Sequence, residues 1–176
     1  MVTLEEVTVI RAPIERCFDL ARSVEVHLAG NTHWGEQAVA AGAVTSGLVG
    51  LEQRVTWRAR HFGVRWTLTS AITAIERPRY FRDEMVRGPF GRMEHEHWFR
   101  AVGQPSAGQD LEVPPRPGGL PHTEMRDVFR FAAPLGILGR LAEWAVLRQY
   151  MAGLLRERSG AIREIAESEA WREYLM

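Results

Sequence analysis

Two histidines and two aspartates are the residues of this sequence best suited to chemistry. His95 and His97 lie two positions apart in a segment typical of a β-strand, so their side chains point to the same side. By the same alternation, Asp83 and Asp127 each share a strand face with apolar residues. The neighbours on these faces are Phe81, Met85, Met93, Phe99, Met125, Phe129 and Phe131. If those apolar side chains mark the interior, the four polar groups need partners there, because buried polar groups are costly when unpaired.

Three interpretations of this polar group remain open. It is a hydrogen-bonded network that supports a sheet, a polar patch that orients a ligand in an apolar cavity, or a metal site in which the His-x-His pair supplies two ligands. An enzymatic variant is also conceivable, in which an aspartate holds one histidine in the tautomer needed for proton transfer. The sequence contains no glycine-rich phosphate loop, nucleophile elbow or HExxH motif.

Large apolar residues supply the candidate walls of a cavity. Trp57 and Trp66 fall on the faces expected to point inward, and Trp34 follows a short helix where a cavity could open. Packing in the core is the alternative for each tryptophan. The residues expected to contact a ligand, besides Asp83, His95, His97 and Asp127, are Trp34, Trp57, Trp66, Phe81, Met85, Phe129, Trp144 and Met151.

Hydrophobic periodicity places these residues on a defined series of elements. An alternating strand over residues 2–10 is followed by a short amphipathic helix from Pro13 and a second one capped by Ser23. A weakly patterned segment at 38–44 precedes strands over 51–61, 64–74, 80–87, 93–102 and 123–131. Residues 103–122, rich in proline and glycine, predict a flexible insertion. An amphipathic helix over 137–167 and a tail at 168–176 complete the chain.

Composition limits the functional classes. The chain has 176 residues, 45% of them hydrophobic, which fits one globular domain. Basic and acidic residues number 22 each, so no overall charge favours nucleic acid or an anionic membrane. Cys17 is the only cysteine, which excludes an intramolecular disulfide, and its apolar surroundings predict a buried, inert thiol. No secretory signal or membrane span is expected, so the cytoplasm is the expected location.

Several phrases carry a resemblance to a known superfamily. They are IRAPIERCFDLARSVEVH, TSGLVGL, VTWRARHFGVRWTLTSAIT, FRDEMVRGPFGRMEHEHWF and MRDVFRFAAPLGILGRLAEWAVLRQYM. Together with the element order, they resemble the START-like superfamily, also called SRPBCC or polyketide cyclase/dehydrase, and within it a bacterial ligand-binding subgroup. The resemblance implies an α+β helix-grip fold, with a curved antiparallel sheet of about six or seven strands around a long C-terminal helix. It implies no metal and no cofactor.

The expected function is non-covalent binding of a hydrophobic or amphipathic small molecule, such as a lipid or a polyketide-like compound, by a carrier or sensor. A curled antiparallel sheet with one helix across its concave side is expected to leave a cavity. The alternatives are a cyclase or dehydratase that uses the same cavity, and a protein-interaction module whose cavity has collapsed. The expected protein is a monomer or homodimer with no nucleic-acid partner.

Overall fold

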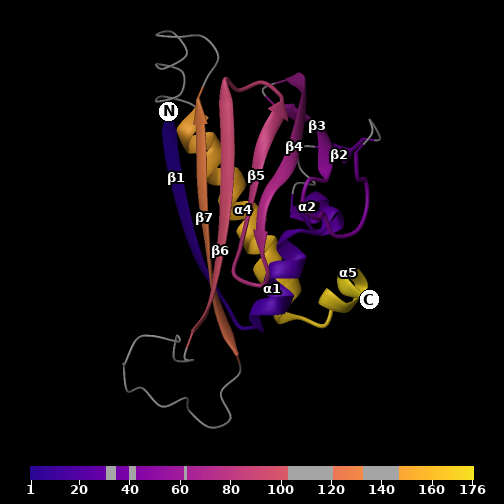
Figure 1. The fold of residues 1–176 in the computed structure, drawn as a ribbon, viewed down its shortest axis with the longest axis vertical. Coiled ribbons are helices and arrows are strands. Elements are labelled where there is room, and N and C mark those ends of the chain that lie inside the picture. The colour runs from indigo at the N-terminus through magenta and orange to yellow at the C-terminus, as the bar shows by residue number, and fades with distance from the viewer. Residues whose placement is uncertain (31–34, 40–42, 62, 103–120, 133–146) are drawn as a thin grey trace.

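A single antiparallel sheet of seven strands organises the chain. The computed structural model describes residues 1–30, 35–39, 43–61, 63–102, 121–132 and 147–176. The strand order is β1-β7-β6-β5-β4-β3-β2, so the first strand pairs with the last (Figure 1). The strands are β1 (Val2–Ile10), β2 (Gln37–Ala38), β3 (Arg54–His61), β4 (Val64–Glu76), β5 (Tyr80–Arg87), β6 (Arg92–Val102) and β7 (His122–Ala132).

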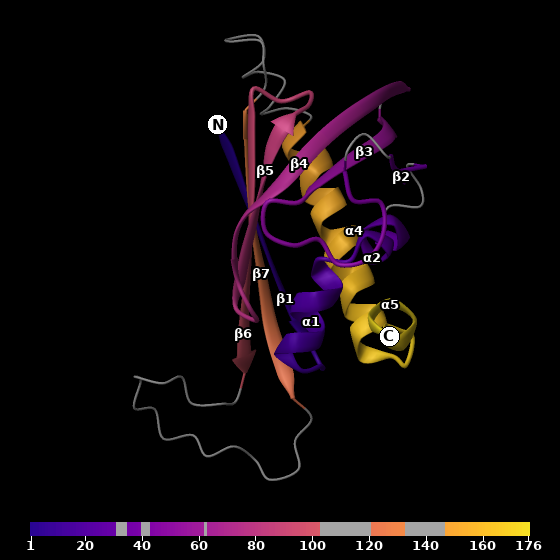
Figure 2. The ribbon, with the colours of Figure 1, turned by 45° about the vertical axis from the view of Figure 1, so that its right-hand side comes forward.

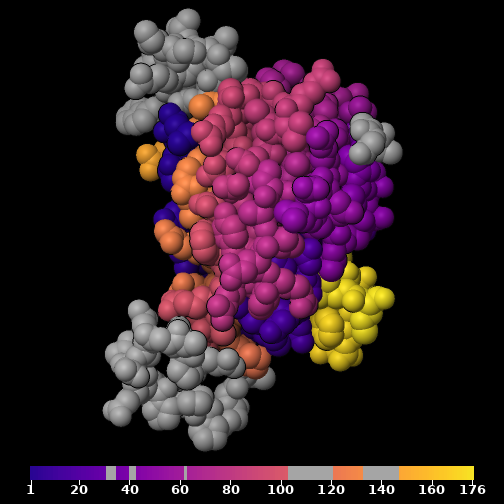
Figure 3. All heavy atoms as spheres, viewed as in Figure 1, coloured from indigo at the N-terminus to yellow at the C-terminus, as the bar shows by residue number. Residues whose placement is uncertain are grey.

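The helices lie on one face of this sheet. The long helix α4 (Arg148–Glu167) crosses the face that also carries α1 (Ile14–Ala21) and α2 (Val24–Gly30), as Figure 2 shows. The short helix α5 (Trp171–Leu175) ends the chain beside α1. Viewed from the side of the sheet that faces away from the helices, the strands and their side chains cover most of α4 (Figure 3). The predicted helix-grip architecture is therefore confirmed.

Strand alternation sets which side chains reach the helices. In β6, Met93, His95, His97 and Phe99 are buried, while the intervening Trp98 is 44% exposed on the outer face. The pairing of β4 with β5 shifts register twice, between Thr69 and Ser70 and between Ile72 and Ala74. Such irregularities increase the local twist of a sheet, which helps it curve around a helix.

The short helices begin where the sequence predicts. Pro13 precedes α1 with extended backbone angles, and Ser23 caps α2, because its Oγ accepts a hydrogen bond from the Val26 N–H at 3.3 Å. Gly30 at the end of α2 lies so close to α4 that an added Cβ would meet the Ala161 Cβ at 3.3 Å. This close approach brings α2 and α4 together beside the polar residues of the sheet.

Several boundaries differ from the prediction. The strand expected from residue 51 begins at Arg54, because Glu52 has a φ of 62° and cannot continue an extended strand. Leu51, the first residue of the expected strand, is 52% exposed. The weakly patterned segment at 38–44 contributes only Gln37–Ala38 as strand, and the C-terminal tail contains the unpredicted helix α5. Residues 137–146 of the helix expected over 137–167 lie outside the described residues. Residues 103–120 of the expected insertion also lie outside them.

The buried apolar residues form two core clusters. The first includes Phe18, Trp57, Phe81, Phe99 and Met125, and it joins the sheet to α1, α2 and the C-terminal half of α4. The second consists of Leu4, Met93, Phe129, Phe131 and Leu155, against the N-terminal half of α4. His95 and His97 follow Met93 and precede Phe99 on β6, so the polar residues lie between the two clusters. In the described part of the chain, no helix is long and apolar enough to cross a membrane.

Candidate functional site

Cross-strand pairing assembles the four polar residues predicted from the sequence. Asp83 of β5 is the register partner of His95 on β6. His97 of β6 is the register partner of Asp127 on β7. Two aspartate–histidine pairs therefore lie side by side on three adjacent strands. Because successive residues of a strand alternate between faces, all four side chains are directed to the helix-covered side.

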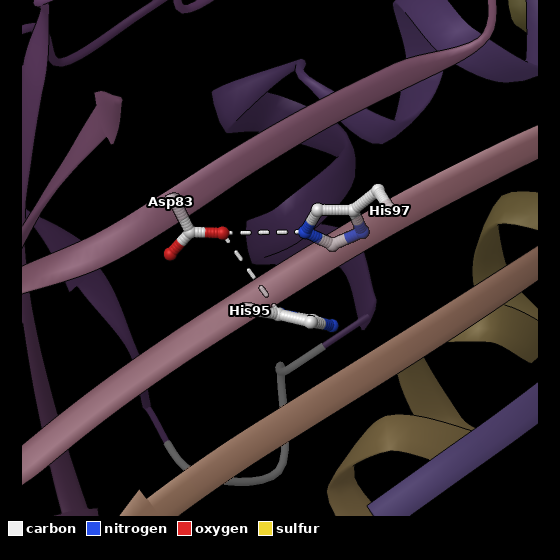
Figure 4. Close-up of side chains that lie close together, drawn as sticks. All are labelled: Asp83, His95 and His97. Atoms are coloured by element: carbon white, nitrogen blue, oxygen red, sulfur yellow. Dashed lines mark hydrogen bonds and ion pairs between the residues drawn. The ribbon is translucent and has the colours of Figure 1, made fainter. Parts of the chain in front are cut away.

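The two histidines lie between the two carboxylates. For His97, Nδ1 is 2.5 Å from Asp127 Oδ1 and Nε2 is 3.2 Å from Asp83 Oδ1. For His95, Nε2 is 3.2 Å from Asp127 Oδ1 and Nδ1 is 3.9 Å from Asp83 Oδ1. Figure 4 shows Asp83 facing both histidines from the neighbouring strand. Each ring thus has one nitrogen toward each aspartate.

Helix α4 adds two polar contacts to this group. The Ser159 hydroxyl donates to Asp127 Oδ2 at 3.3 Å. The Arg158 guanidinium has Nη1 3.5 Å from His95 Nδ1, and its Nη2 donates to the Ala21 carbonyl at 3.1 Å. The network therefore joins three strands of the sheet to α4 and to the end of α1.

Burial and the opposite charges set the protonation of the group. Burial lowers the pKa of His95 to about 4, and the neighbouring His97 charge adds to this effect against the pull of the aspartates. Burial raises the pKa values of Asp127 and Asp83, but hydrogen bonds and charges from His95 and His97 outweigh it, so both carboxyls titrate below their ordinary range. At neutral pH, His95 is uncharged and both aspartates are ionised.

Two buried nitrogen atoms near this group lack a hydrogen-bond partner among the described residues: His95 Nε2 and Arg22 Nε. The His95 Nε2 atom is 3.2 Å from Asp127 Oδ1, so the carboxylate attracts it electrostatically without an aligned hydrogen bond. The His95 ring is therefore held less firmly than the His97 ring.

A pocket opens beside the network. It is bounded by apolar side chains of α1, α2 and β3–β5 and by two charged members of the site, Asp83 and Arg158. His27 closes one side and stacks on Trp57, with 3.9 Å between ring centroids. The pocket volume is about 50 Å³, which accommodates water-sized groups rather than a whole lipid. Its lining is Ala21, Arg22, Ser23, Val24, His27, Val49, Gln53, Val55, Trp57, Ser70, Ile72, Phe81, Asp83 and Arg158.

The predicted ligand contacts are distributed over three regions. Trp57 and Phe81 line the pocket together with Asp83. Met85, Phe129 and Met151 lie instead in or against the second core cluster. Trp66 is 40% exposed near the β3–β4 turn, where its Nε1–H donates to the His61 carbonyl at 3.3 Å. Trp34 and Trp144 lie outside the described residues.

Sequence reasoning missed the contributions of α4 and α2. Ser159 could have been found, because Leu155, Ser159 and Ile162 recur at helical spacing on the buried face of α4. Arg158 and His27 carried no such signal, since each is a single polar residue whose direction depends on how the helices pack. The metal interpretation keeps a geometric basis, because one donor atom from each of Asp83, His95 and His97 lies within 4.8 Å of the other two.

Comparison with solved structures identifies the fold. A START superfamily protein from Mycobacterium smegmatis matches with a TM-score of 0.60 and 9% identity, over 94% of this chain and 97% of that chain. The ginseng major latex-like protein 151 from Panax ginseng matches with a TM-score of 0.61 and 11% identity, over 95% and 98%. A protein from Thermus thermophilus matches with a TM-score of 0.61 and 17% identity, over 92% and 97%.

At these identities, the similarity establishes a shared fold and leaves the activity open. No family model matches the sequence. No curated protein matches it either. The chain therefore has a START-like fold, in agreement with the resemblance drawn from its sequence.

Proposed function

We propose that this protein binds an amphipathic small molecule inside its fold, such as a lipid or a polyketide-like compound, and acts as a carrier or sensor. The observation that carries this proposal is the pocket in which apolar walls meet Asp83 and Arg158. Binding cavities typically combine apolar lining with a few polar groups that fix the orientation of the ligand. The shared START-like fold supports an internal site of this kind.

The two parts of the pocket would have different roles. Trp57, Phe81 and Ile72 offer apolar surface, whose burial against a ligand stabilises the complex by roughly 25 cal/mol per Å². Arg158 and Asp83 offer opposite charges for the polar end of the ligand. A hydroxyl or carbonyl group suits this end, because it can pair with the guanidinium while leaving the Asp83–His97 contact in place.

A ligand larger than about 50 Å³ requires the pocket walls to separate. The walls belong to different elements, since His27 and Val24 come from α2 whereas Trp57 and Ser70 come from β3 and β4. Binding that moves α2 away from the sheet would expose the stacked His27 and Trp57 rings to the ligand. We therefore expect a change in Trp57 fluorescence when a ligand binds.

Native mass spectrometry of freshly purified protein, followed by solvent extraction, tests the proposal. The expected result is a co-purified apolar compound that is released by the solvent. The Ser70→Val variant fills the pocket and should abolish this occupancy, whereas Thr67→Val on the exposed part of the same strand should retain it. A chain free of small molecules, which also fails to bind a panel of fatty acids and aromatic polyketides, would refute the proposal.

The pocket volume favours one rival, a protein-interaction module whose cavity has collapsed, because ligand cavities commonly exceed roughly 300 Å³. The effect of Ser70→Val on stability distinguishes a ligand-binding protein from an interaction module with a collapsed cavity. In a ligand cavity, the added methyl groups occupy free space and the free energy of unfolding holds or rises. In a collapsed core, they overpack it, and the protein loses about 1–3 kcal/mol.

A further inference from the structure

We propose that Asp83, His95 and His97 bind a divalent transition-metal ion through Asp83 Oδ1, His95 Nδ1 and His97 Nε2. These residues offer donor atoms that lie within 4.8 Å of one another (Figure 4). The Asp83 oxygen is 3.2 Å from the His97 nitrogen and 3.9 Å from the His95 nitrogen. A tetrahedral zinc ion with bonds of about 2.0–2.1 Å separates its ligand atoms by roughly 3.4 Å, so small side-chain movements complete the site.

The opposite nitrogens of both rings face one carboxylate. Asp127 Oδ1 lies 2.5 Å from His97 Nδ1 and 3.2 Å from His95 Nε2, and Ser159 donates to the other oxygen of Asp127. Histidines that bind metals typically donate their remaining N–H to a carboxylate, which fixes the tautomer and makes the ligand nitrogen more basic. His97 is placed for such a bond, whereas His95 Nε2 lies near the carboxylate without an aligned hydrogen bond. Asp127 thus orients both rings with their other nitrogens toward Asp83.

The donor set selects the class of ion. Two imidazole nitrogens and one carboxylate oxygen suit Zn²⁺, Fe²⁺ or Co²⁺, whereas Ca²⁺ and Mg²⁺ prefer all-oxygen sites. Asp83 also lines the pocket, so the remaining coordination positions face the space where we place the polar end of the ligand. This inference departs from the metal-free cavity expected from the sequence.

Arg158 opposes the ion. Its Nη1 is 3.5 Å from His95 Nδ1, the atom assigned to the metal, and its positive charge repels a cation. The guanidinium must therefore move toward the pocket, which it also lines, before the ion binds. Removing the charge should increase metal affinity, an effect opposite in sign to the loss of a ligand.

The test uses untagged, full-length protein treated with a chelator and titrated with Co²⁺ and Zn²⁺. We expect one ion per chain by calorimetry and a visible Co²⁺ spectrum typical of a nitrogen–oxygen site. Asp83→Asn and His95→Gln should weaken binding at least about tenfold, and Arg158→Gln should strengthen it. His61→Gln removes a histidine that contacts Tyr150 and belongs neither to the pocket lining nor to the proposed ligand set, so it should leave the affinity unchanged.

Three results would overturn the site: no stoichiometric Co²⁺ or Zn²⁺ binding by the wild-type protein, equal affinity in Asp83→Asn, or loss of binding in His61→Gln. If His95→Gln fails to fold, Asp83→Asn and Arg158→Gln still decide the question, because both side chains border the pocket. Mass spectrometry of the chelator-treated protein reports separately whether a small molecule is bound. The metal site can therefore be refuted while the proposed ligand binding holds, and ligand binding can be refuted while the metal site holds.

Discussion

At the scale of single residues, the buried histidine–aspartate group brings two negative carboxylates into the interior. The pKa values of Asp83 and Asp127 stay below their ordinary range despite burial, because His97 contacts both carboxylates and Arg158 lies close to Asp83. Removal of one member of such a group leaves the others uncompensated.

We predict that Asp127→Asn destabilises the fold by about 3–5 kcal/mol, because the amide removes the charge that faces His97 while the ring remains buried. Urea unfolding followed by circular dichroism measures the change. Glu5→Gln serves as the control, since it removes a carboxylate from the solvent-exposed pair with Arg126 and should leave the midpoint close to wild type. Equal midpoints for the two variants would contradict the charge argument.

The depressed pKa of His95 predicts a stability that depends on pH. The unfolded chain takes up a proton near pH 6.5, whereas the folded chain resists it until about pH 4. Stability is therefore fully present above pH 6.5 and falls as the pH decreases toward 4, by roughly 3 kcal/mol. His95→Gln should flatten this part of the profile, measured as the free energy of unfolding at each pH.

His61 provides the matched control for that profile. Burial also lowers its pKa, but it pairs with Tyr150 away from the aspartates. His61→Gln should therefore retain most of the slope between pH 6.5 and 4. If the pH dependence were lost in His61→Gln and retained in His95→Gln, the assignment of the effect to His95 would be wrong.

Cys17 is predicted to react slowly in the folded protein. It is fully buried, and burial raises the pKa of its thiol to about 11, so little thiolate forms at pH 8. A chromogenic disulfide reagent should modify it at least a hundredfold more slowly in buffer than in concentrated urea. Similar rates in both solutions would show that α1 opens readily.

At the scale of elements, strand alternation accounts for what could be predicted. It placed Asp83, His95, His97 and Asp127 on one face, since the period of two holds along β5, β6 and β7. It could not foresee that β3 begins after a residue with positive φ at Glu52, because a conformation that favours glycine is occupied here by another residue. Nor could it place Arg158, whose contact with His95 depends on the rotation of α4.

We predict that Glu52→Gly stabilises the protein by about 1 kcal/mol, because glycine relieves the cost of the left-handed conformation before β3. Thermal unfolding measures the gain. Glu76→Gly at the end of β4 is the control and should destabilise, since glycine weakens a strand. A loss of stability in Glu52→Gly would mean that the Glu52 side chain contributes more than its backbone strain costs.

At the scale of the whole molecule, the polar group lies between two apolar clusters that share strands β1, β6 and β7 and helix α4. The first cluster joins α1, α2, β1, β3–β7 and the C-terminal half of α4, whereas the second joins β1, β6, β7 and the N-terminal half of α4. The hairpin strands β3, β4 and β5 are close in sequence, and β1 pairs with β7 from the far end of the chain. Contacts distant in sequence form late in folding, because their loop closure costs more entropy.

Two core substitutions should therefore act on different rates. Ile72→Val, in β4 among strands that are close in sequence, should slow folding, whereas Leu4→Ala, in β1, should cost about 2–5 kcal/mol and mainly accelerate unfolding. Stopped-flow chevrons with tryptophan fluorescence separate the two rates. Slower folding in Leu4→Ala, with unchanged unfolding, would reverse the proposed order.

The placement of β1 at the sheet edge beside β7 also has a consequence during synthesis. Val2 aligns with Phe131 and Ile10 with Thr123, so β1 leaves the ribosome more than a hundred residues before its hydrogen-bonding neighbour. Until then, its backbone N–H and C=O groups and its apolar side chains stay accessible to other nascent chains. Holdase chaperones that bind extended segments would protect this N-terminal strand until translation reaches residue 132 and beyond.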